Sequence, residues 1–201
     1  PSGFYYEWAG QSEYLESAMQ RLIYIIPLTF ALIFVLIFLA LKNFTYTMMI
    51  FFTLPFALTG GIFYLEFLNF NISIAVIVGF LALLGVAAET SIVMLVYLNE
   101  AIEDLKEKTS KIDKNDIFEA VYKGAVLRLR PKLMTLFAIL GGLIPIMYIN
   151  TVGSEVMQRI AAPMIGGMLS SAFLTLIIIP AIFYIINIKE FKNKESNYSK
   201  R

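Results

Sequence analysis

A single glutamate interrupts a long apolar stretch of this sequence. Glu89 lies in "GVAAETSIVML", residues 85–95, where most neighbours are apolar and the rest are small. A carboxylate deep in a membrane-spanning helix costs roughly 2.5–3.5 kcal/mol on insertion scales, and such residues often lie on ion or proton pathways. Three roles remain open: a structural glutamate paired with Ser, Thr or backbone, a group that gains and loses a proton, and a direct cation ligand.

Small residues accompany the glutamate at helical spacing. Ala75, Gly79, Ala82 and Gly85 lie three or four residues apart, toward the face that carries Glu89. Small side chains let a second helix approach closely. The spacing therefore predicts that Glu89 faces protein rather than lipid.

Lys132 is the only basic residue close enough to a span to act as a partner. It follows a proline in "RLRPKLMT", residues 128–135, and proline is typical of the first turn of a helix. If the helix starts at Pro131, Lys132 is expected to extend toward lipid headgroups. If the helix starts earlier, Lys132 lies deeper, and a proton switch shared with Glu89 follows.

Met157 is a candidate metal ligand. Most of the nine methionines fall within apolar stretches, where Met usually serves packing. Met157 instead lies at the edge of a span in "GSEVMQRIAAP", two residues after Glu155. Thioethers bind monovalent copper and silver in preference to hard cations. The sequence has no Cys and no His, which excludes thiolate and imidazole sites.

The composition indicates a membrane protein. Hydrophobic residues make up 59% of the chain, and the charged residues gather in the first 21 residues, in 99–132 and after 188. A net charge of +1 gives no indication of a nucleic-acid partner. We expect no enzyme and no cofactor, because the chain has neither a GxxxxGK(S/T) phosphate loop nor a histidine-based nucleophile pair.

Five apolar segments are long enough to cross a membrane. The predicted fold is therefore all-α, a polytopic membrane helix bundle of five transmembrane helices. Residues 1–21 would end an external region, 99–131 would form a cytoplasmic loop with an amphipathic helix at 116–127, and 189–201 would form a basic tail. The predicted spans are 22–41, 46–68, 72–98, 132–149 and 160–188.

The basic residues orient these spans. Fourteen of the 16 flank one side, and only Arg21 and Arg159 flank the other. Basic residues concentrate on the cytoplasmic side of membrane proteins, so the C-terminus is predicted to be cytoplasmic. Because the sequence opens with Pro1 rather than Met, we expect it to be part of a longer protein.

Three stretches resemble a known family: "GVAAETSIVMLVYLNEAIE", "AVYKGAVLRLRPKLMT" and "GSEVMQRIAAPMIGGM". They are similar to the C-terminal end of the heavy-metal efflux branch of the resistance-nodulation-division (RND) transporters, and most similar to its copper/silver members. The opening "PSGFYYEWAGQSEYLESA" resembles the segment that enters the eighth transmembrane helix of that family. The resemblance covers almost the whole chain and ends in the tail.

The resemblance implies a function and partners. These transporters are proton antiporters of the bacterial inner membrane, embedded in lipid as homotrimers, and they work with a periplasmic adaptor and an outer-membrane channel. In the copper/silver branch, a Glu and a Lys that match Glu89 and Lys132 join an Asp from the first half of the protein in the proton relay. One methionine of the metal path matches Met157. The transported species would then be Cu(I) or Ag(I), together with protons.

Other functions stay open at this point. The chain could belong to an RND pump for divalent metals or organic compounds, or be a non-transporting truncated membrane fragment with a structural Glu89. The five spans correspond to the last five of the twelve in that family. We therefore do not expect the chain to pump by itself, since transport needs both halves.

Overall fold

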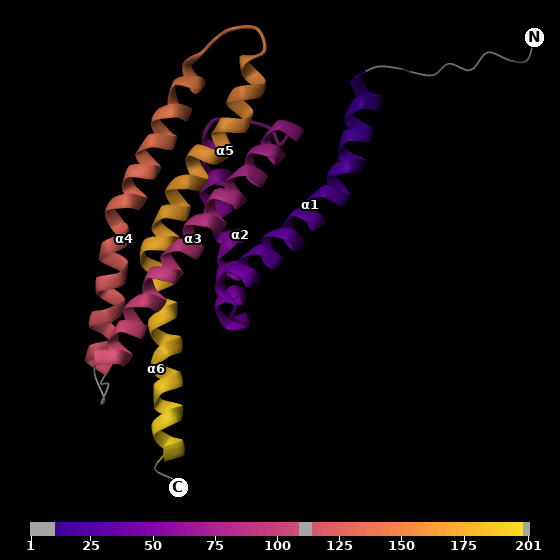
Figure 1. Ribbon diagram of the computed structural model, residues 1–201. Helices are drawn as coiled ribbons and strands as arrows, with labels where there is room; N and C mark the ends of the chain where they lie inside the picture. Colours follow the sequence, from indigo (N-terminus) through magenta and orange to yellow (C-terminus); the bar gives the residue numbers. More distant parts are fainter. Residues whose placement is uncertain (1–10, 109–113, 199–201) are drawn as a thin grey trace, which may run out of the picture.

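The computed structural model describes residues 11–108 and 114–198, and this part of the chain is helical and contains no strand (Figure 1). The all-α prediction is confirmed. Within the same ranges, five helical stretches are long and apolar enough to cross a membrane. The helices are α1 (Gln11–Leu41), α2 (Phe44–Phe67), α3 (Ile74–Lys108), α4 (Lys114–Leu143), the 3₁₀ turn η1 (Ile144–Tyr148), α5 (Ser154–Phe173), the π-helical turn η2 (Leu174–Ile178) and α6 (Ile179–Tyr198).

The predicted cytoplasmic loop is mostly helix. α3 continues ten residues beyond the predicted end of its span, and α4 starts at Lys114 and passes through Pro131 without a break. The helix start at Pro131 is therefore wrong, whereas residues 116–127 are helical as predicted and form part of the first half of α4. The apolar face of the segment packs on α3: a Cβ at Gly124 would lie 3.1 Å from the Tyr97 carbonyl oxygen. A proline inside a helix removes one backbone hydrogen bond, which the contacts along the rest of the helix can offset.

α5 packs closely on both α2 and α3. A Cβ added at Gly60 would clash with the Gly166 carbonyl oxygen, and a Cβ at Gly166 would clash with that of Gly60. A Cβ at Gly79 of α3 would likewise clash with the Ile160 carbonyl oxygen of α5. Glycines at these positions let the helix backbones touch. We call α2, α3 and α5 the inner unit.

α1 is attached more loosely. It joins α2 through Lys42, which has a positive φ of 49°, and Asn43, whose side chain accepts a hydrogen bond from the Thr45 backbone N–H. Near this turn, Phe34 makes edge-on contacts with Phe44 and Phe51 of α2. Away from the turn, α1 leans outward from the other helices (Figure 1).

The connections sort into two ends. The start of α1, the turn between α2 and α3, and the connection between α4 and α5 lie at one end of the bundle (Figure 1). The turn between α1 and α2, the end of α3 and the end of α6 lie at the other. The positive-inside rule predicts that the first end is external and the second cytoplasmic, and we use these two names as labels below.

Candidate functional site

Glu89 and Lys132 lie on two helices that pack against each other. Glu89 is 15 residues after the start of α3, roughly 22 Å along the helix axis. Lys132 is 11 residues before the end of α4, roughly 16 Å along its axis. Both side chains therefore start well inside the helices rather than at their ends.

Lys132 is buried, with an exposed fraction of 3%. The expectation that it extends to lipid headgroups is therefore wrong. The reason is the early start of α4, which carries Lys132 into the packed interior. Its ammonium group lies within electrostatic range of Glu89 and Arg128. No ion pair joins Lys132 to Glu89 in the part of the chain that the structure describes.

Glu89 is exposed, and the neighbouring hydroxyls do not donate to it. Thr90 Oγ1 donates to the Val86 carbonyl at 2.6 Å, and Ser91 Oγ donates to the Ala87 carbonyl at 2.7 Å. A hydroxyl has one hydrogen to donate, so neither can also bond the carboxylate. Thr90 and Ser91 therefore give no support to a structural role in which Glu89 is held by a neighbouring hydroxyl.

The face of α3 around Glu89 is open within this chain. Ala82, Gly85 and Glu89 are exposed, and a Cβ at Gly85 would have no atom within 4 Å among the described residues. Among the described residues, Gly79 packs against α5, whereas Ala82, Gly85 and Glu89 are exposed. That Glu89 faces protein rather than lipid stays a prediction. The surface that carries the carboxylate is thus accessible.

Arg128 belongs to the same cluster, although the sequence alone indicates only a cytoplasmic charge at this position. It lies one helical turn before Lys132, and its guanidinium carbon is 5.6 Å from the centre of the Tyr97 ring on α3. Its Nε is buried and, within the described residues, has no hydrogen-bond partner. The i, i+4 spacing of Arg128 and Lys132 on one helix is the sequence signal that could have identified it.

Met157 lies at the external end, in the first turn of α5, with 61% of its surface exposed. The turn before it needs Gly153, which has a φ of 88°. The next two residues fasten this turn: Gln158 Nε2 donates to the Ile149 carbonyl at 2.8 Å, and Arg159 Nη1 donates to the Asn71 carbonyl at 3.3 Å. A firmly held turn therefore presents an exposed thioether.

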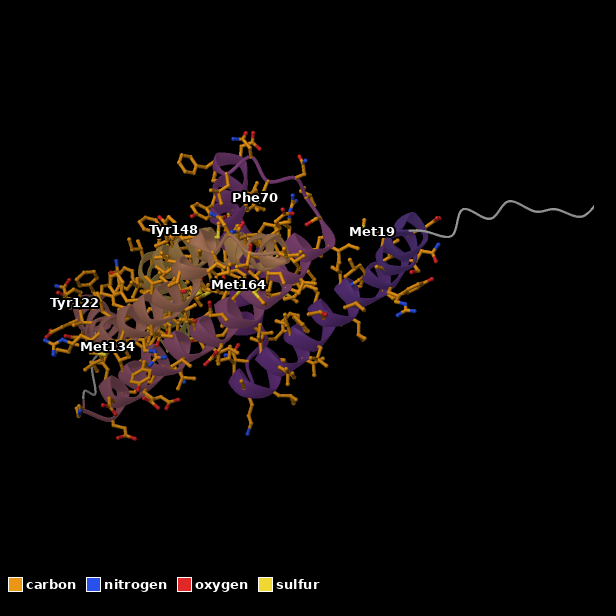
Figure 2. The ribbon with its side chains drawn as sticks, turned by 90° about the horizontal axis from the view of Figure 1, so that it is seen from above. Met19, Phe70, Tyr122, Met134, Tyr148 and Met164 are labelled. Atoms are coloured by element: carbon orange, nitrogen blue, oxygen red, sulfur yellow. The ribbon has the colours of Figure 1, made fainter. Side chains whose placement is uncertain are left out.

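Other methionines lie elsewhere. Met164 of α5 packs at the edge of the core, and Met19 lies far from it on α1 (Figure 2). Among the described residues, no group of three or more His, Cys, Asp or Glu side chains could hold a metal ion. Met157 is not set apart by exposure, because Met134 of α4 is 71% exposed. It is set apart by its place in the first turn of α5, at the external end.

The inner unit links the two ends of the candidate site. Met157 lies three residues before Ile160, the residue whose carbonyl touches Gly79 of α3. Further along, a Cβ at Gly167 would clash with the Leu83 side chain, two helical turns from Glu89. The close packing of α3 on α5 therefore connects the helix that carries Glu89 with the helix that carries Met157.

Comparisons with known proteins give a consistent result. The AcrB/AcrD/AcrF family profile matches residues 1–187. The putative cation efflux system protein SilA of Salmonella typhimurium is 46% identical over 191 residues, which cover 94% of this chain and 18% of SilA. The cation efflux system protein CusA of Escherichia coli is 46% identical over 181 residues, which cover 89% of this chain and 17% of CusA.

A more distant relative and a solved structure extend the comparison. The cobalt-zinc-cadmium resistance protein CzcA of Cupriavidus metallidurans is 38% identical over 190 residues, covering 94% of this chain and 17% of CzcA. The crystal structure of a heavy metal efflux pump superimposes with a TM-score of 0.74 at 34% identity, over 92% of this chain and 18% of the pump. The chain spans less than a fifth of the length of these proteins.

Proposed function

Because this chain belongs to the AcrB/AcrD/AcrF family of RND transporters, we propose that it is the C-terminal membrane part of a proton-driven efflux pump for Cu(I) or Ag(I). The observation that carries this proposal is that a buried lysine, Lys132, lies within electrostatic range of a carboxylate on the adjacent helix, Glu89. The identity to the cation efflux proteins SilA and CusA supports cation export, and the thioether of Met157 supports a monovalent cargo.

Proton uptake would change the charge balance between the two helices. When Glu89 is ionised, its carboxylate attracts the Lys132 ammonium, and Arg128 adds a second positive charge one turn away. When Glu89 takes a proton, that attraction disappears while the repulsion between Lys132 and Arg128 remains. α3 and α4 would then shift relative to each other. The inner unit would transmit the shift to Met157, which would hold the metal ion during part of the cycle.

The rest of the pump would complete the site. We place the protein in the bacterial inner membrane, with its C-terminus in the cytoplasm and with lipid around the bundle. The open face of α3 at Ala82, Gly85 and Glu89 would be covered by helices from the remainder of the full-length protein. The complete pump would be a homotrimer that works with a periplasmic adaptor and an outer-membrane channel.

Export of divalent metals is the second candidate. It is favoured by the 38% identity to CzcA, which is named for cobalt, zinc and cadmium. Met157 argues against it for zinc and cobalt, because these divalent ions prefer imidazole and carboxylate ligands over a thioether. Survival on zinc and cobalt, measured beside survival on copper and silver, separates the two.

The test uses the full-length gene in a copper- and silver-sensitive host. Wild type should restore growth on both metals, and Glu89→Gln should abolish growth at the same protein level. Glu66→Gln, an exposed carboxylate two residues before the C-terminal cap of α2, is the matched control and should keep full resistance. Retained resistance in Glu89→Gln would make Glu89 structural. Failure of the wild type would remove the metal-export proposal or identify the chain as a non-transporting fragment.

A further inference from the structure

A wider helical turn divides the last span. Within the described residues, η2 is the one π-helical turn, and it lies between α5 and α6. The Ile179 backbone N–H donates to the Leu174 carbonyl, five residues back instead of the four of an α-helix. A π turn therefore holds one residue more than a turn closed by the α-helical bond. Such turns are frequent at functional sites and are one of the known causes of sharp bends in helices.

Two side chains weaken the regular hydrogen bonding around η2. Pro180 has no N–H, so it donates to neither the Thr175 nor the Leu176 carbonyl. Thr175 Oγ1 donates to the Ser171 carbonyl at 2.7 Å, and a hydroxyl bonded to the carbonyl one turn back often bends a helix. Both features favour a bend at this point of the span.

The two sides of η2 pack on different helices. Before it, α5 packs mainly on α2 and α3, and Ser170 Oγ donates to the Ala57 carbonyl of α2 at 2.7 Å. After it, α6 packs mainly on α4, where the Tyr184 and Phe118 rings meet edge-on with centroids 5.7 Å apart. The span therefore joins the inner unit to α4 through a single turn.

The buried apolar residues divide at the same turn. One core cluster includes Ile165, Met168 and Ala172 of α5. Another includes Leu174 of η2 with Ile179 and Phe183 of α6. A bend at η2 would therefore move one cluster relative to the other, without cutting through either of them.

We propose that η2 is a hinge, at which α6 swings together with α4 while α5 stays with α2 and α3. The inference rests on the proposed function for its driving force, the shift between α3 and α4 when Glu89 takes a proton. Without a hinge, the continuous helix from α5 to α6 would resist that shift. Lys189 lies 11 residues beyond Ile178, roughly 16 Å along the axis, so a bend of about 20° would move it by about 5 Å.

The first test removes the extra residue of the π turn. Deletion of Ile177, an exposed residue of η2, should return the segment to α-helix and keep the faces of α5 and α6 as they are. In the full-length protein the unfolding temperature should not fall, whereas copper and silver resistance should drop to the level of the host without the pump. A turn that served packing alone would lose stability and resistance together.

Pro180→Ala tests the hinge even where the deletion does not fold. It supplies the missing N–H and straightens the helix, so resistance should fall without a fall in the unfolding temperature. Pro55→Ala is the matched control, because Pro55 also lies inside a helix, α2, but in regular α-helical surroundings. It should keep full resistance.

The motion itself is measured as a distance between two spin labels. Glu100→Cys on α3 and Lys189→Cys on α6 place them at exposed positions, and this chain has no cysteine of its own. With labelled protein diluted in unlabelled protein, wild type should give a distance distribution about 5 Å wider than the Ile177 deletion does, or than Pro180→Ala where the deletion does not fold.

Three results would overturn the hinge: equal distance distributions, full resistance in a folded Ile177 deletion, or a joint loss of stability and resistance in both the deletion and Pro180→Ala. Failure of the wild type to restore growth on copper and silver would instead remove the proposed function. The distance distributions would then still decide whether η2 bends, so the two failures are distinguishable.

Discussion

Two faces of α3 carry similar residues and have opposite surroundings. On one face Gly79 touches the backbone of α5, and a single added carbon would clash with the Ile160 carbonyl oxygen. On the other face a Cβ added at Gly85 would have no described atom within 4 Å, and Glu89 next to it is exposed. The closed face holds the inner unit together, and the open face presents the carboxylate. The contrast between Gly79 and Gly85 shows that small residues allow another helix to approach closely, but do not determine which helix does so.

The largest expected effect concerns the charge of Lys132, the buried lysine of α4 within electrostatic range of Glu89. Lys132→Met keeps a long, flexible side chain of similar volume in a site that is 3% exposed, so the full-length protein should fold. It removes the positive charge near Glu89, so copper and silver resistance should fall to the level of the host without the pump. The measurement is survival on each metal at matched protein levels. Full resistance in Lys132→Met would show that Glu89 works without Lys132.

The second effect tests the contrast between the two glycines. Gly79→Ala should lower the free energy of unfolding by about 1–3 kcal/mol, because α3 and α5 must separate to admit the methyl group. Gly85→Ala, its matched control on the same helix, should cost less of that free energy than Gly79→Ala, because the added methyl group meets no atom of the described residues. Thermal unfolding of the full-length protein in detergent measures both. Equal losses would mean that the open face is packed as tightly in the complete protein as the closed face.

The sequence alone predicts the fold class correctly, but it does not predict which residues surround Glu89 and Lys132. Long apolar runs define membrane helices because the hydrocarbon core sets their length, and the five-helix prediction is confirmed. Lys132 was placed too near the cytoplasmic boundary, because proline favours a helix start and only tertiary packing carries α4 through Pro131. The two faces of α3 could not be distinguished, because Gly79 and Gly85 present the same lack of a side chain. The roles of Glu89, Lys132 and Met157 in transport stay predictions.

The smallest expected effect concerns the position of Arg128, which lies one helical turn from Lys132 toward the cytoplasmic end of α4. The Arg128 guanidinium lies over the Tyr97 ring at 5.6 Å, a contact between α4 and α3 that the closed face does not share. Tyr97→Leu removes the ring and should cost about 0.5–1 kcal/mol of stability at this exposed position, whereas Tyr97→Phe keeps the ring and should cost nothing measurable. If the contact also holds Arg128 near Lys132, Tyr97→Leu should reduce metal resistance and Tyr97→Phe should not. Equal stability and equal metal resistance of Tyr97→Leu and Tyr97→Phe would show that the Tyr97 ring does not position Arg128. Glu89 would then be the one residue of α3 proposed here to influence the charges of α4.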